Sequence, residues 1–181
     1  KEPFSQSVVF SIQPGERAPL NRVSISGNRL VSDNELSEGF FSRSPTPLGV
    51  FTQAGLYHKP FMDQDIQRLL SNYYRFGFLE ARVLGTRIQA QQDMKGLHAH
   101  MDVIEGPQFE LIGITMEGEV PGEDNFASWR EQISIQDGQI ANLIQIQQEA
   151  DTMLNQLREQ GYDFARVEQA VALGLPPSGR E

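Results

Sequence analysis

The first part of the chain alternates apolar and polar residues and then carries a helix start signal. In "NRVSISG", apolar Val23 and Ile25 stand between polar neighbours, which predicts a half-buried strand ending in a turn. In "VSDNEL", Ser32 is followed three residues later by Glu35, the spacing of a capping box. We therefore expect a strand followed by a short helix that runs to about Phe41.

A second helix follows in "FMDQDIQRLLSNYYRFG". Its apolar residues Met62, Ile66, Leu69 and Tyr73 recur at helical spacing and form one apolar face. Gly77 stands where a left-handed residue commonly ends a helix. The chain then continues as "EARVLGTRI", which predicts a second strand.

A third strand is predicted by "LHAHMDVIEGP". Apolar Ala99, Met101 and Val103 alternate there with polar residues. The order strand, helix, helix, strand, strand predicts an α+β fold in which one sheet carries two helices on one face.

The same pattern occurs twice. "GFLEARV" at 77–83 returns as "GYDFARV" at 161–167, and "IQPGERAPLNRVSISGN" at 12–28 resembles "VIEGPQFELIGITMEGE" at 103–119. Such self-similarity indicates tandem homologous units. Because Gly77 and Gly161 each end a helix before a strand, both are expected to have positive φ. The repeat assigns structural roles to five glycines: Gly27, Gly77, Gly106, Gly118 and Gly161.

The repeat also divides the chain. Residues 1–16 are expected to be the last strand of a preceding domain, and residues 17–106 a complete unit. Residues 107–175 are expected to form a unit that lacks its third strand, and residues 176–181 a tail.

The first residues carry the pattern of a third strand without the rest of its unit. Val8, Phe10 and Ile12 alternate with other residues as Ala99, Met101 and Val103 do. A strand of this kind could fill the vacant place in the last unit of another molecule. We therefore expect head-to-tail strand exchange, as a consequence of truncation, or else a distorted last unit.

The composition and net charge of the chain restrict the classes of partner and site that it could have. No apolar run is long enough to span a bilayer as a helix, and the formal net charge is −9 without a Lys/Arg cluster. This charge disfavours nucleic acid and anionic lipid surfaces as partners. The chain has no cysteine, which excludes disulfides and thiolate metal sites.

Two polar clusters could carry chemistry. His98, His100 and Asp102 alternate on one strand face, where a metal could be held, but a solvated polar face also explains them. Asp63 and Asp65 could form a carboxylate pair, but near a helix start they suit the helix dipole. We expect no metal, no cofactor and no catalytic residues.

The order of the elements, together with "PGERAPLNRVSISGN", "EGPQFELIGITMEG" and the helix-Gly-aromatic-x-x-Ala-Arg-Val motif, resembles polypeptide-transport-associated (POTRA) domains. These are tandem periplasmic modules of BamA-type outer-membrane β-barrel assembly proteins. The resemblance implies modules that precede a membrane-embedded barrel, which this chain does not contain. It also implies that they receive unfolded β-barrel precursors, dock accessory lipoproteins and have neither catalytic residues nor a cofactor.

The resemblance further implies a mixed sheet with the third strand in the centre and the second on an edge. An extended client could add a strand to that edge through main-chain hydrogen bonds. We assign the edge to Arg82, Leu84, Thr86 and Ile88. Tyr74 and Phe76 are the aromatic residues that could form an exposed client patch.

Two alternatives remain open on the sequence. The modules could be the POTRA arm of a two-partner secretion transporter. In a different class of function, the chain could be a small metal-binding or enzymatic α+β domain.

Overall fold

The computed structural model describes residues 9–13, 19–42, 57–91, 96–118 and 126–171. Val8 and the expected tail over 176–181 lie outside the described residues. The helices and strands follow in the order β1 (Leu20–Ser26), α1 (Asp33–Leu36), α2 (Lys59–Arg75), β2 (Arg82–Gln91), β3 (Gly96–Ile104), α3 (Phe126–Gln132) and α4 (Leu143–Glu159).

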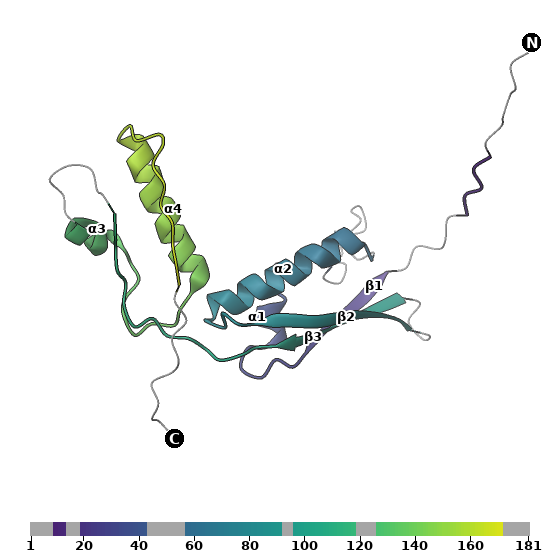
Figure 1. Ribbon diagram of the computed structural model, residues 1–181. Coiled ribbons are helices and arrows are strands. Elements are labelled where there is room, and N and C mark those ends of the chain that lie inside the picture. Colours follow the sequence, from purple (N-terminus) through teal and green to yellow (C-terminus); the bar gives the residue numbers. More distant parts are fainter. Residues whose placement is uncertain (1–8, 14–18, 43–56, 92–95, 119–125, 172–181) are drawn as a thin grey trace, which may run out of the picture.

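The first unit contains a three-stranded mixed sheet in the order β1-β3-β2. The central strand β3 is parallel to β1 and antiparallel to β2. α2 lies across one face of this sheet, and no helix among the described residues covers the opposite face (Figure 1). The expected α+β arrangement, with the third strand in the centre, is confirmed.

The core of the first unit lies between α2 and the sheet. Leu69 and Tyr73 of α2 are fully buried, as are Ala99 and Met101 of β3. Phe78 follows the end of α2 and packs edge-on against Tyr73, with ring centroids 5.8 Å apart. Burying each large apolar side chain contributes about 1.5–3 kcal/mol, so these contacts hold helix and sheet together.

α1 is shorter than the sequence pattern predicts. Ser32 and Glu35 form the expected capping box, but the helix ends at Leu36 rather than near Phe41. The backbone N–H groups of Phe41 and Ser42 donate to the carboxylate of Asp65 on α2, at 2.6 and 2.9 Å. These amides are therefore not available to continue α1.

The second unit has helices but no sheet among its described residues. Its small core contains Trp129, Ile135, Ala141 and Ala150, which are all buried. The strands that the repeat predicts for the second unit are not formed in its described residues, where a single bridge joins Glu110 to Ile140. A strand needs a hydrogen-bonded neighbour, and the described residues supply no central strand here.

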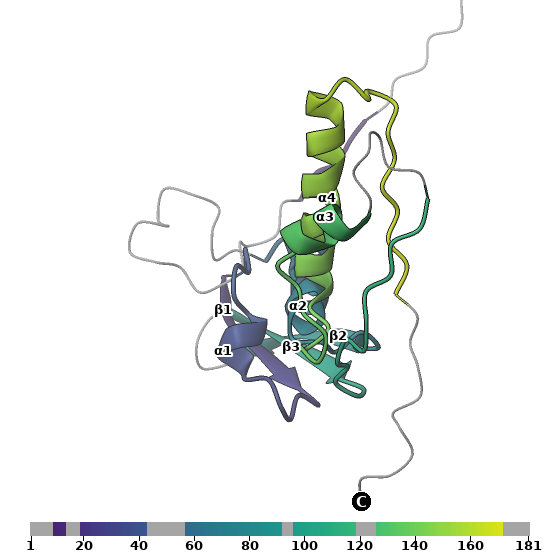
Figure 2. The same ribbon diagram turned by 90° about the vertical axis from the view of Figure 1, so that its left-hand side faces the viewer.

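The two units meet at the end of α2. The Phe109 N–H donates to the Gly77 carbonyl at 2.9 Å, and the Gln108 side-chain amide donates to the Phe76 carbonyl at 2.9 Å. α2 also contacts α4, which rises from this junction (Figures 1 and 2). The last turn of α2 therefore seats the second unit.

Candidate strand-binding edge and the open sheet face

β2 forms one edge of the sheet, because its only strand neighbour among the described residues is β3. The outer side of an edge strand presents backbone N–H and C=O groups that no sheet partner occupies. The pairing with β3 shifts between Val83 and Gly85, which marks a bulge at Leu84. Leu84 is 63% exposed, so β2 carries an apolar side chain at this irregular point of the edge.

The bulge separates the four residues assigned to this edge into two sets. Arg82 and Leu84 are exposed, whereas Thr86 and Ile88 are half-buried. Thr86 lies opposite Met101 of β3, on the side that faces α2, and Ile88 follows it two residues later on the same side. The assignment assumed a regular strand, in which all four side chains would share a face. Gly85 inside the strand pattern was a signal for a bulge.

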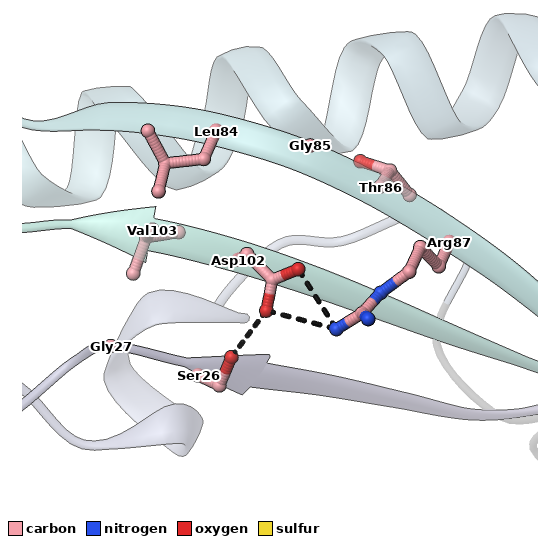
Figure 3. Close-up of a pocket in the computed structure, with 8 residues that line it drawn as sticks. All are labelled: Ser26, Gly27, Leu84, Gly85, Thr86, Arg87, Asp102 and Val103. Atoms are coloured by element: carbon pink, nitrogen blue, oxygen red, sulfur yellow. Dashed lines mark hydrogen bonds and ion pairs between the residues drawn. The ribbon is translucent and has the colours of Figure 1, made fainter.

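A shallow hollow lies beside the bulge on the open face of the sheet (Figure 3). The Arg87 guanidinium lies 2.9 Å from Asp102 Oδ2, and Ser26 Oγ donates to Asp102 Oδ1 at 2.7 Å. The hydrogen bond from Ser26 lowers the pKa of Asp102, with further lowering by Arg87 and His100. The polar side chains Ser26, Arg87 and Asp102 of the hollow are therefore hydrogen-bonded or ion-paired to one another. Its lining residues are Ser26, Gly27, Leu84, Gly85, Thr86, Arg87, Asp102 and Val103.

The two histidines of β3 bond to serines of β1. Ser24 Oγ lies 2.8 Å from both His98 Nε2 and His100 Nδ1, and His100 Nε2 lies 3.1 Å from Asp102 Oδ1. Partial burial lowers the pKa of His98, and Arg22 and His100 add to that effect. No group of three or more His, Cys, Asp or Glu side chains in the described part of the chain is arranged to hold a metal ion. The three polar residues do share a face, where they belong to a hydrogen-bonded ladder across the sheet.

Asp63 and Asp65 are not a carboxylate pair. Asp63 is exposed and forms an ion pair with Lys59 at 2.8 Å. Asp65 is fully buried and accepts the amides of the segment after α1. Neither residue lies in the first turn of α2, because the helix starts at Lys59, earlier than the dipole argument assumed. This structural role of Asp65 was missed because its partners lie more than twenty residues away in the sequence.

The two aromatic residues considered for a client patch are both half-buried. Phe76 packs against the core of the first unit, and the Arg75 guanidinium lies 5.0 Å from its ring centroid. Neither Tyr74 nor Phe76 is among the exposed large apolar side chains of the described residues. The exposed apolar residue at the edge is Leu84 instead.

The glycine expectation is confirmed at both helix ends. Gly77 has a φ of 81° and Gly161 a φ of 94°, in the left-handed region that is common at helix C-termini. The other glycines assigned structural roles, Gly27, Gly106 and Gly118, also have positive φ. No helix in the described ranges has the length and apolar character that a bilayer crossing requires.

Comparison with known proteins agrees with this fold. The family model described as POTRA, surface antigen variable number repeat, matches residues 18–106. The chain is 22% identical over 160 residues to the outer membrane protein assembly factor BamA of Neorickettsia risticii, covering 88% of this chain and 21% of that protein. It is 25% identical over 113 residues to BamA of Neisseria meningitidis serogroup B, covering 61% of this chain and 14% of that protein. The chain thus spans about a fifth or less of the length of these relatives.

The crystal structure of Haemophilus influenzae BamA POTRA3-5 has a similar fold. Its TM-score is 0.59 at 20% sequence identity, and the match covers 81% of this chain and 57% of that one. Both this match and the 160-residue alignment are longer than the first unit and extend into the second. Taken with the central third strand, the edge strand β2 and the positive-φ glycines, the family match identifies residues 18–106 as a POTRA domain.

Proposed function

We propose that this chain is a periplasmic POTRA scaffold of an outer-membrane protein assembly factor. In this role it receives unfolded β-barrel precursors by adding their strands to β2, and it docks accessory subunits. The likeness to BamA proteins supports the class of function. The single observation that supports the mode of binding is the position of β2 at the edge of a three-stranded sheet.

Strand addition suits a receiver of many clients. The contacts are made by backbone groups, which are the same in every extended peptide, so affinity depends little on client sequence. The half-buried Thr86 and Ile88 keep β2 attached to the core, while Leu84 stands 63% exposed beside the open face. An incoming strand would cover this apolar side chain, which adds a favourable contact without a specific pocket.

The binding edge can be tested by disulfide trapping, because the chain has no cysteine of its own. A strand-forming peptide with one cysteine is incubated with the Leu84→Cys variant under mild oxidation. The matched control is Arg22→Cys, an exposed position on β1 at the opposite edge of the same sheet. We expect the disulfide at Leu84→Cys and little at Arg22→Cys.

The backbone mode is tested with two N-methylated forms of that peptide, methylated at alternate amides and offset by one residue. An added strand bonds through only one of its edges, so one methylation pattern should abolish trapping and the other should leave it. Equal trapping at both edges of the sheet, or equal effects of the two patterns, contradicts strand addition at β2. Trapping at Val167→Cys but not at Leu84→Cys would place peptide binding in the second unit instead.

A further inference from the structure

Gly85 lies inside the edge strand β2, where a glycine weakens the strand because it has no side chain to pack. Its φ lies outside the left-handed region, so the backbone conformation does not require a glycine. A Cβ added at Gly85 would meet no described atom within 4 Å apart from its chain neighbours. By contrast, a Cβ added at Gly96 of β3 would overlap the Asn21 side chain. Packing therefore requires a glycine at position 96, whereas Gly85 only leaves space.

The space over Gly85 belongs to the hollow on the open face of the sheet (Figure 3). Gly85 lies opposite Asp102 of β3, and residues opposite each other in a sheet share a face. Leu84 and Arg87 lie on either side of Gly85 along β2, and the Arg87 side chain extends towards Asp102. The hollow is therefore bounded by an apolar side chain, a bare stretch of backbone and a guanidinium group.

These boundaries fit an aromatic ring. In sheets, an aromatic side chain on a neighbouring strand covers a glycine well, and here its edge would contact Leu84. The Arg87 side chain is 62% exposed, and its ion pair with Asp102 orients the guanidinium, which can stack on a ring. An aliphatic side chain would gain nothing from the guanidinium. A carboxylate would lie near Asp102 and a cationic side chain near Arg87, so like charges disfavour both.

We propose that the hollow beside Gly85 binds one aromatic side chain of the strand that adds to β2. The hollow has this role only if strands add to β2 as proposed above. The residue of an added strand that lies opposite Gly85 points to the same face, so its side chain lies over the glycine. An aromatic side chain is also long enough to reach a diagonal neighbour such as Arg87.

A preference at one position also sets the register of the added strand. The backbone contacts are common to all extended peptides, and they repeat every second residue. Backbone contacts alone therefore allow several registers that differ by two residues. An aromatic residue held over Gly85 makes one of these registers more stable than the others, although most of the client sequence is not read.

The preference is tested with two strand-forming peptides that contain Phe or Leu at one central position and no other aromatic residue. NMR chemical-shift titration gives the dissociation constant of each peptide. The Gly85→Val variant fills the hollow with a side chain that strands favour. The matched control, Gln89→Val, places the same side chain on the same face of β2, at an exposed position outside the hollow.

We expect the unmodified chain to bind the Phe peptide about threefold or more tightly than the Leu peptide. This ratio should fall to about one in Gly85→Val, with the Leu peptide still bound, and should persist in Gln89→Val. Equal affinities of the two peptides for the unmodified chain, or equal ratios in the two variants, overturn the aromatic site and leave strand addition intact. Absence of binding by both peptides contradicts strand addition at β2 itself.

The Arg87→Gln variant tests the stacking contact without filling the hollow. The ion pair of Arg87 with Asp102 is largely exposed, so its loss should change stability little. The preference for Phe over Leu should decrease, because a neutral amide does not provide the attraction between a cation and a ring. An unchanged preference in Arg87→Gln overturns the guanidinium contact, whatever Gly85→Val shows.

The register is tested by disulfide trapping at Gln89→Cys, since the chain has no cysteine of its own. Gln89 and Gly85 are four residues apart on one face of β2. A peptide cysteine four residues from the Phe, before or after it according to strand direction, should therefore react. A cysteine three residues from the Phe points to the other face and should react less. This dependence on spacing should disappear when Leu replaces Phe, and equal yields at both spacings in the Phe peptide overturn the register.

Discussion

Gly77 has two structural roles: it adopts the left-handed conformation after α2, and it contacts the second unit. Its φ of 81° is strained for any side chain with a Cβ, and its carbonyl accepts the Phe109 amide of the second unit. A Cβ added there would lie 2.6 Å from Ile140 Cγ2 and 3.0 Å from the Phe109 carbonyl oxygen. The equivalent Gly161 has a similar φ of 94°, but no described atom lies within 4 Å of an added Cβ. Substituting each of the two glycines therefore distinguishes the cost of backbone strain, which both share, from the cost of close packing, which arises only at Gly77.

Gly77→Ala should destabilise the chain more than Gly161→Ala. Both substitutions carry a strain of about 1–2 kcal/mol for a left-handed Ala. Gly77→Ala adds an overpacking cost on the order of 1–3 kcal/mol, because Ile140 must move. Urea unfolding followed by far-UV circular dichroism measures both variants. Equal losses of stability in the two variants would show that Ile140 moves away from the added Cβ at no cost in stability.

His98 should make stability depend on pH. Partial burial lowers the pKa of His98 in the folded chain below the usual value of about 6.5. Just below pH ~6.5 the unfolded chain then binds the proton more readily, so stability falls as pH falls through the folded pKa. Asp102, whose pKa is also lowered, loses its contribution only in more acidic solution, below about 4.

The His98→Gln variant should show a flatter dependence of stability on pH just below ~6.5, because the titrating group is removed. Thermal unfolding at closely spaced pH values measures this slope for both proteins. An unchanged slope in His98→Gln would assign the dependence to other groups. Behaviour in more acidic solution, where Asp102 titrates, should be retained in the variant.

At the scale of elements, α2 carries two aspartates with different tasks. Asp65 is fully buried and accepts two backbone amides, which attach the segment after α1 to α2. Asp63, two residues earlier, is exposed and pairs only with Lys59. An exposed ion pair of this kind contributes little, whereas a buried acceptor is costly to remove.

Asp65→Ala should lower the free energy of unfolding by about 2–4 kcal/mol, because it leaves the amides of Phe41 and Ser42 unpaired. Asp63→Ala should change it by less than about 1 kcal/mol. Chemical denaturation of the two variants under identical conditions gives the comparison. Similar losses of unfolding free energy in the two variants would mean that water accepts the hydrogen bonds of Phe41 and Ser42 in place of the Asp65 carboxylate.

Local signals were sufficient to predict the regular elements of the first unit. The capping box at Ser32 and the helix end at Gly77 depend on residues close in sequence, and both are present. The bulge at Leu84 depends on how β2 pairs with β3, so alternation alone could not predict that the side chains of Thr86 and Ile88 are half-buried while those of Arg82 and Leu84 are exposed. The strands predicted in the second unit depend on a central partner that the described residues do not provide.

At the scale of the whole molecule, the two units should differ in protection from hydrogen exchange. β3 is paired on both sides, whereas residues 112–117 and 166–171 have no backbone hydrogen bond to other described residues. In dilute protein, peptides from β3 should exchange slowly and peptides from these two segments rapidly. Mass spectrometry of exchanged and digested protein resolves the difference. Slow exchange in the two segments at low concentration would contradict the unpaired state.

The turn at Gly77 also bears on the shape of longer arrays. The second unit sits on the first through two backbone carbonyls of that turn, at Phe76 and Gly77. Gly161 offers a turn of similar φ, with open space around it among the described atoms. A unit seated there in the same way would be related to its neighbour by the same rotation and translation. Repeating one rigid operation generates a screw, so the pitch and handedness of such an array would be set by this single turn.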